Sequence, residues 1–282
     1  MHIRNPVEWG VDQVRSAGTA IERIGHHTHD ARRPAVRRIT ASDVGDALAR
    51  GVDDFAAMRT DVAFLCVVYP LAGLVLARLV FGYGLLPLLF PLASGFALIG
   101  PVAAVGLYEM SRRREAGADV GWADALAVFR VPSFGSIVLF GLLLMAIFLV
   151  WLTVAIAIYD VTLGPDQPRS IAAFARALFT TDAGWALIAV GIGVGFLFAV
   201  LVLAISVVSV PLLLDRDVGL FVAIRTSLLA VAMNPGPTAA WGFIVAAALV
   251  IGSIPVFLGL IVVMPVLGHA TWHLYRRMVS PL

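Results

Sequence analysis

The sequence predicts an all-α polytopic membrane protein with six transmembrane helices and three cytoplasmic amphipathic helices in a pseudo-threefold repeat. Hydrophobic residues make up 60% of the chain and charged residues 13%, and the mean hydropathy is +0.95. In soluble domains about a quarter of the residues are charged. The tripeptide Asp-Val-Gly occurs three times, starting at Asp43, Asp119 and Asp217. Each copy opens a short amphipathic stretch that leads into long apolar runs, as expected for an internal repeat.

Residues 1–39 precede the first repeat and form a predicted cytoplasmic arm. Apolar residues recur at helical spacing over residues 6–25, which indicates an amphipathic helix. Residues 26–39 are polar and basic, and we interpret them as a linker. The remainder, residues 40–282, is the predicted membrane domain.

The first repeat covers about residues 40–114. Its amphipathic helix is expected to begin near Thr40, with Asp54 mostly on the polar side. The predicted apolar face consists of Val44, Leu48, Val52, Phe55 and Met58. Two membrane spans follow, at about 62–81 and 85–108, separated by a glycine-rich turn.

The second repeat covers about residues 115–214. A span at about 135–158 follows the break at Pro132-Ser133. The polar loop 159–183 contains a short amphipathic piece, and a long span follows at about 184–213.

The third repeat covers residues 215–282 and breaks at Asn234-Pro235-Gly236-Pro237. The apolar run that follows, 238–274, is nearly twice the length of about 20 residues that one span needs. We therefore expect it to divide at Gly252-Ser253-Ile254-Pro255 into two short helices, which gives six spans.

The arginines predict the orientation of the chain. There is no lysine, and of the 20 arginines only Arg78, Arg169 and Arg176 fall on one predicted side of the membrane. The positive-inside rule then puts both termini and the three amphipathic helices in the cytoplasm. We expect a multi-pass protein of a bacterial inner membrane.

Two histidines in the last predicted span are candidate ligands for a metal or haem. His269 and His273 are spaced i, i+4 and share one helix face. Glu109, at the matching end of the second span, is a candidate third ligand. The alternative, which we favour, is that the histidines are structural and that Glu109 forms a local ion pair with Arg112 and Arg113.

Further residues are expected to anchor or pack the spans. An aromatic residue stands seven positions after Pro101 and again after Pro265, and two arginines follow each time. The predicted interface anchors are Tyr108, Arg112, Arg113, Trp272, Arg276 and Arg277. Gly191 and Gly195 form a GxxxG step that predicts close helix packing in the fourth span.

The chain shows none of the motifs of hydrolases, kinases or zinc enzymes, and its single cysteine, Cys66, excludes an intrachain disulfide. We therefore expect no catalytic residues and no cofactor, although the sequence does not define an activity. The leading hypothesis is a non-enzymatic scaffold or assembly partner of membrane complexes, in contact with lipid and with no nucleic-acid partner. One alternative is a small-solute transporter or channel, because prolines interrupt the spans. The other is a haem- or metal-binding redox protein.

The phrases GPVAAVGLYEMSRR (residues 100–113) and GHATWHLYRR (residues 268–277) resemble a bacterial integral-membrane family called domain of unknown function 2189. The resemblance extends over about residues 36–279. It implies a multi-span protein of the bacterial inner membrane without an established activity.

Overall fold

The computed structural model describes residues 34–58, 61–62, 66–82, 86–164 and 170–280. The predicted amphipathic helix at residues 6–25 lies outside these ranges. Within them the regular structure is helical, apart from a single bridge that pairs Val36 with Val279. The all-α prediction is therefore confirmed.

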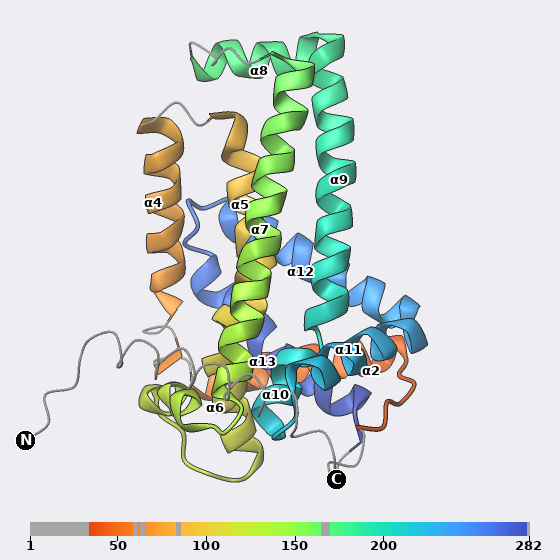
Figure 1. Ribbon diagram of the computed structural model, residues 1–282. Coiled ribbons are helices and arrows are strands. Elements are labelled where there is room, and N and C mark those ends of the chain that lie inside the picture. Colours follow the sequence, from red (N-terminus) through yellow and green to blue (C-terminus); the bar gives the residue numbers. More distant parts are fainter. Residues whose placement is uncertain (1–33, 59–60, 63–65, 83–85, 165–169, 281–282) are drawn as a thin grey trace, which may run out of the picture.

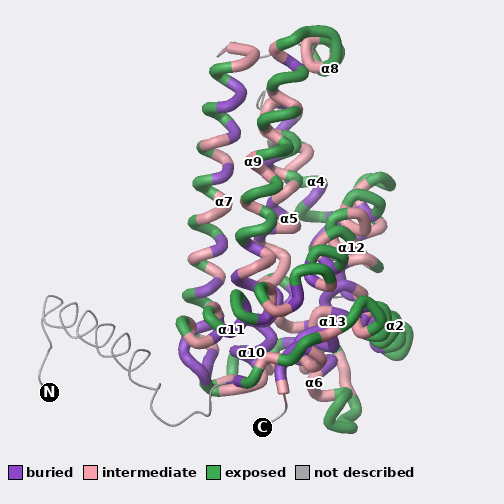
Figure 2. The backbone as a smooth tube through the Cα atoms, turned by 90° about the vertical axis from the view of Figure 1, so that its right-hand side faces the viewer, coloured by how far each residue is buried: buried purple, intermediate pink, exposed green. Residues whose placement is uncertain are grey.

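Four helical segments are long and apolar enough to cross a membrane. The first segment, Leu86–Glu115, contains η1 (Leu86–Leu88), α5 (Leu89–Ala103) and α6 (Val105–Glu115). The second is α7 (Phe134–Thr162), and the fourth is α12 (Pro235–Ser253). The third, Asp182–Asp215, contains α9 (Asp182–Ser206) and α10 (Ser209–Asp215). The outer faces of α7 and α9 carry exposed large apolar side chains, such as Leu142 at 61% and Phe196 at 65%. Figure 2 shows exposed residues along both helices, and exposed faces of this apolar composition suit lipid.

The count of six spans is not shown. The two other predicted spans correspond to α4 (Val68–Gly82) and α13 (Leu260–Met278). The described part of α4 has 15 residues, fewer than the 20 or so that a span needs. The last half of α13 carries histidines and arginines, which lower its hydropathy. The predicted break between these last two helices is present, since α12 ends at Ser253 and α13 begins at Leu260.

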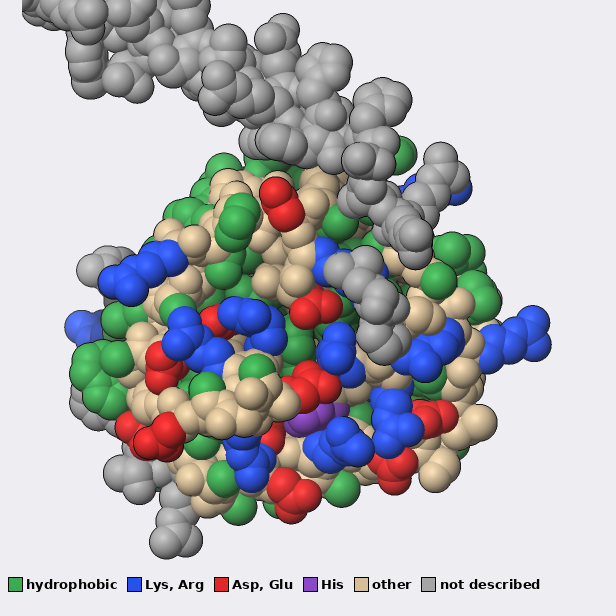
Figure 3. Space-filling model, turned by 90° about the horizontal axis from the view of Figure 1, so that it is seen from below, with side chains coloured by type: hydrophobic (Ala, Val, Ile, Leu, Met, Phe, Trp, Pro, Cys, Tyr) green, Lys and Arg blue, Asp and Glu red, His purple; other side chains and the backbone are tan. Residues whose placement is uncertain are grey.

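The long helices have two distinct ends (Figure 1). Helix α8 (Ile171–Thr180), the predicted amphipathic piece, lies across the far ends of α7 and α9. At the opposite end gather α2 (Ala41–Ala57), α6, α10, α11 (Leu220–Met233) and the last turns of α13. The 3-10 helix η2 (Trp122–Arg130) packs against α6 at this same end. We call this end the charged end, because most of the described charged side chains lie there (Figure 3).

The three Asp-Val-Gly copies all lie at the charged end, but their local structures differ. The first lies inside α2, whose N-cap is Thr40, and Asp43 accepts hydrogen bonds from the N–H and hydroxyl of Thr40, both at 2.8 Å. Asp119 and Asp217 instead precede η2 and α11, which begin at Trp122 and Leu220. The second element is a 3-10 helix, so a threefold structural repeat is not shown.

The buried face of α2 overlaps the predicted apolar face, since Val44 and Met58 are buried, but its centre is shifted toward small residues. Its buried stripe is Val44, Ala47, Gly51, Asp54 and Met58, whereas Val52 of the predicted apolar face is 47% exposed. The physical reason is close contact with α13. A Cβ at Gly51 would lie 2.6 Å from the backbone nitrogen of Ala270. Helices that approach this closely do so through small residues. Leu48 and Phe55 still pack against the core, and only Val52 is left exposed.

Candidate functional site: a buried polar cluster

Five polar side chains meet where α2, α6 and α13 converge. They are Asp54 from α2, Ser111 and Arg114 from α6, and His269 and His273 from α13. Asp54, Ser111 and His269 are at most 4% exposed, and His273 is 8% exposed. We call this group the Asp54 cluster. It joins residues more than 200 positions apart in the chain.

Asp54 is the centre of the cluster's hydrogen bonds. Its Oδ2 accepts a hydrogen bond from the hydroxyl of Ser111 at 2.6 Å and from Nε2 of His273 at 2.9 Å. Its Oδ1 accepts from the guanidinium of Arg114. A buried carboxylate is stabilised when such donors replace its lost hydration.

The same bonds assign the tautomer of His269. Since Ser111 gives its only proton to Asp54, Nδ1 of His269, at 2.7 Å from that hydroxyl oxygen, must donate to it. In the neutral ring Nε2 then carries the lone pair. This Nε2 is buried and has no hydrogen-bond partner among the described residues.

Electrostatics favour a charged carboxylate and a neutral histidine. Burial alone would raise the pKa of Asp54, but hydrogen bonds from His273, Ser111 and Arg114 outweigh it and lower the pKa to about 2. Helix α13 lies outside the four candidate spans, and burial there lowers the pKa of His269 to about 4. At pH 7 the cluster therefore contains Asp54 as an anion beside the cation of Arg114.

The geometry does not match that of a serine hydrolase. In a catalytic triad the serine gives its proton to a histidine, which a carboxylate orients. Here Ser111 donates directly to Asp54, and Ser111 is 0% exposed. The hydroxyl is therefore neither activated by a base nor accessible to a substrate.

The described residues contain no group of three or more His, Cys, Asp or Glu side chains placed to hold a metal ion. Glu109, the candidate third ligand, is 0% exposed and forms a bidentate pair with Arg112, at 2.7 and 2.8 Å. It also accepts a hydrogen bond from Arg113 at 2.7 Å. The carboxylate is thus engaged by arginines of its own helix and is not among the hydrogen-bond partners of either histidine.

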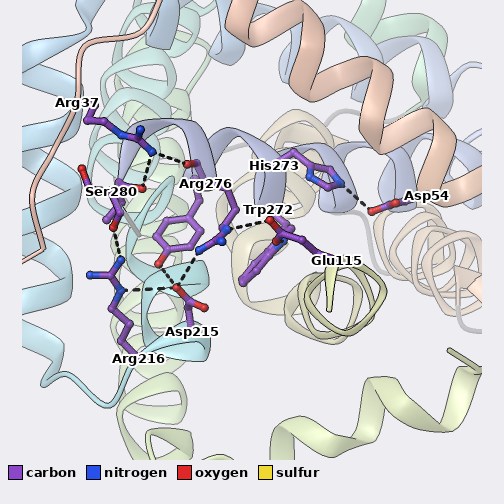
Figure 4. Close-up of polar contacts among 11 residues, drawn as sticks. Arg37, Asp54, Glu115, Asp215, Arg216, Trp272, His273, Arg276 and Ser280 are labelled. Carbon is purple, nitrogen blue, oxygen red and sulfur yellow. Dashed lines mark hydrogen bonds and ion pairs between the residues drawn. The ribbon is translucent and has the colours of Figure 1, made fainter. Parts of the chain in front are cut away.

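The last turns of α13 form a second set of polar contacts with the neighbouring helices (Figure 4). Trp272 donates through Nε1 to Glu115 of α6 at 3.0 Å, and Arg276 contacts the same carboxylate at 3.2 Å. Tyr275 donates to Asp215 of α10 at 2.6 Å. Arg277 pairs with Asp43 and Asp46 of α2, each at 3.2 Å. Side chains of one helix therefore bind α2, α6 and α10 together.

The structure buries the two expected aromatic anchors, whereas the arginine anchors are partly exposed. Tyr108 and Trp272 are 2% and 1% exposed, so both rings lie in the core. Arg276 and Arg277 pair with carboxylates, as described above. A Cβ at Gly195 would lie 3.1 Å from the ring of Trp151 in α7, whereas one at Gly191 would meet nothing within 4 Å.

Sequence reasoning missed Asp54, Ser111 and Arg114 as partners of the two histidines. The helical spacing alone predicts Asp54 on the polar side of its helix. A signal for burial was present, since Val44, Ala47, Gly51 and Asp54 are spaced by three, four and three residues and share one face. A stripe of small residues ending in a carboxylate indicates a packed face with a buried acid. Nothing comparable in the sequence singles out Ser111 or Arg114.

The long apolar helices with lipid-suited outer faces define a multi-pass α-helical integral membrane protein. The family model described as predicted integral membrane protein (DUF2189) matches residues 89–215, from α5 to α10. Over these residues the chain is similar to this family, which agrees with the sequence resemblance. Searches of curated proteins and of solved structures find no match.

Proposed function

We propose that this protein is a non-enzymatic membrane scaffold, which offers its charged end to other membrane complexes. The observation that carries the proposal is the binding of α2, α6 and α10 by the last turns of α13. Six side chains of α13, from His269 to Arg277, contact partners on these three helices. A surface whose helices are held together by such hydrogen bonds and ion pairs is pre-organised, which lowers the entropic cost of binding a partner.

The chemistry of the charged end supports binding rather than catalysis. The reactive groups of the Asp54 cluster are buried and bonded to one another. The outer face of α2 is polar and open, with Arg50 and Asp53 exposed. Positive and negative side chains are mixed over the end face (Figure 3). Such a mixture favours specific charge complementarity with a partner over non-specific binding of a polyanion.

We further propose that the charged end is cytoplasmic, with both termini on that side of a bacterial inner membrane. In the described part of the chain, the only arginines that lie away from the charged end are Arg78 on α4 and Arg176 on α8. The positive-inside rule supports this orientation. The division into an arm, residues 1–39, and a membrane domain, residues 40–282, remains part of the proposal, as do six spans and a threefold repeat.

Site-specific photo-crosslinking in living cells tests the scaffold proposal. A crosslinking amino acid is placed at Ala49 or Asp53, both exposed on α2, and in matched controls at Leu142 or Phe196 on the lipid face. We expect discrete protein adducts from the two α2 positions and none from the controls. Loss of all adducts at α2, or equal adducts at the lipid-facing controls, would count against a partner at the charged end.

A second candidate is a proton-coupled transporter of a small solute. It is favoured by the buried Asp54 and by the unpartnered Nε2 of His269, since buried ionisable groups serve as proton relays in transporters. The test is proton uptake into liposomes that contain the purified protein. Uptake that is lost in Asp54→Asn and retained in Asp53→Asn would favour this candidate over the scaffold.

A further inference from the structure

Helix α11 exposes three large apolar side chains on one face and buries small residues on the opposite face. Phe221 is 77% exposed, and Leu228 and Leu229 are 45% and 48% exposed. Together with the exposed Arg225 they follow the spacing i, i+4, i+7 and i+8, so they form one face. The opposite face is buried and consists of Ala223, Thr226, Ser227 and Ala230. A helix with this distribution presents an apolar surface outward.

Arg225 lies in the middle of this apolar face without an anionic partner. Several other arginines at the charged end pair with carboxylates, as Arg113 does with Asp124 at 2.7 Å and Arg277 with Asp43 at 3.2 Å. Among the described residues no carboxylate pairs with Arg225. An exposed guanidinium between apolar side chains is free to bind an anion from outside the chain.

The position of α11 indicates where that anion comes from. The helix packs against α7, α9 and α10 and crosses the end of α9 at the charged end (Figure 1). Its exposed face therefore adjoins the lipid-suited surface of α9, at the level where the long apolar helix gives way to charged residues. This is the level of phospholipid headgroups.

The same pattern occurs independently in η2. Leu126 is 49% exposed and Phe129 is 65% exposed, and they are followed by the exposed Arg130. No carboxylate pairs with Arg130 among the described residues. Two separate elements at the charged end thus combine exposed apolar side chains with an unpaired arginine.

We propose that the exposed face of α11 binds a phospholipid, with Arg225 on the headgroup phosphate and with Phe221, Leu228 and Leu229 among the acyl chains. A guanidinium matches a phosphate with two parallel hydrogen bonds, which a lysine ammonium does not reproduce. Arg130 of η2 makes a second, weaker contact of the same kind.

Native mass spectrometry of the full chain in detergent, titrated with phosphatidylglycerol, tests this binding. Removing one arginine near a membrane surface should weaken lipid binding about fivefold, so we expect this loss in Arg225→Gln. Arg225→Lys should lose part of the affinity, and adding Arg130→Gln should weaken binding further. The matched control is Arg38→Gln, an exposed arginine whose neighbours Val36 and Ile39 pack against the core.

An unchanged affinity in Arg225→Gln, or an equal loss in Arg38→Gln, would overturn the proposal. Competition by inorganic phosphate at equal concentration would show a soluble-anion site and would also overturn it. A second measurement does not depend on the arginine. In a Cys66→Ala background, a fluorophore on Leu229→Cys should be quenched by phospholipids with brominated acyl chains. Absence of quenching, or cross-linking of this cysteine to a protein, would assign the face to another occupant.

Discussion

Two glycines of α2 provide a direct test of how this helix is held. Gly51 faces α13, whereas a Cβ added at Gly45 of the same helix would meet nothing within 4 Å. Both glycines are in helical backbone, so an alanine gains roughly 1 kcal/mol of helix propensity at either position. Gly45→Ala should therefore stabilise the protein, and it serves as the matched control.

At Gly51 the contact with α13 opposes this gain. The added Cβ would lie 2.6 Å from Cβ and backbone nitrogen of Ala270 and 2.7 Å from the carbonyl oxygen of Val266. Helix α2 must move away by roughly 1 Å to reach ordinary contact, because carbon atoms are optimally about 3.5–4.0 Å apart. Forcing extra volume into a packed contact costs about 1–3 kcal/mol. The propensity gain is common to both variants and cancels, so we expect them to differ by about 1–3 kcal/mol in free energy of unfolding.

The assay is thermal unfolding of both variants and the wild type in the same detergent, combined with amide hydrogen exchange over α2. The midpoint should be highest for Gly45→Ala and lowest for Gly51→Ala, and exchange of the α2 amides should be faster in Gly51→Ala alone. A Gly51→Ala protein as stable as Gly45→Ala would refute the close packing of α2 on α13.

Three further expectations follow from the structure. Asp54→Asn should lower the free energy of unfolding by about 1–3 kcal/mol, because it weakens the buried hydrogen bonds from Ser111 and His273, whereas the exposed Asp53→Asn should melt like the wild type. The pKa of Asp54 is about 2 in the folded protein, below its ordinary value of 3.8. Its stabilising contribution is therefore present above pH 4 and is lost as the pH falls through about 2. Acid should accordingly shift the melting point of Asp54→Asn less than that of the wild type. A reporter that is active only in the periplasm should stay silent at the C-terminus, and strong activity would reverse the proposed orientation. Gly195→Leu should lower the melting point because the ring of Trp151 occupies the space, while Gly191→Leu should leave it unchanged.

The breaks between elements were predictable because they depend on local backbone chemistry. Proline cannot donate a helical hydrogen bond, and asparagine and glycine favour turns. Accordingly α7 begins just after Pro132-Ser133, and α11 ends just before Asn234-Pro235. The amphipathic piece within the polar loop is likewise present as α8.

The ion pair of Glu109 was also predictable, since Arg112 and Arg113 stand three and four residues further along the same helix. At that spacing side chains are neighbours whatever the tertiary fold. The membrane class follows in the same way from composition, because the hydropathy of a segment does not depend on its neighbours.

The close contact of α2 with α13 and the meeting of the residues of the Asp54 cluster depend on the tertiary structure. In a membrane protein the outer face of a helix is apolar too, so hydrophobic spacing does not tell which face meets lipid and which meets protein. That choice was made by the close approach of Gly51 to Ala270, two residues far apart in sequence. Once α2 is held there, Asp54 is buried beside His273. The sequence determined the elements and their apolar character, and the packing of α13 determined which polar residues meet.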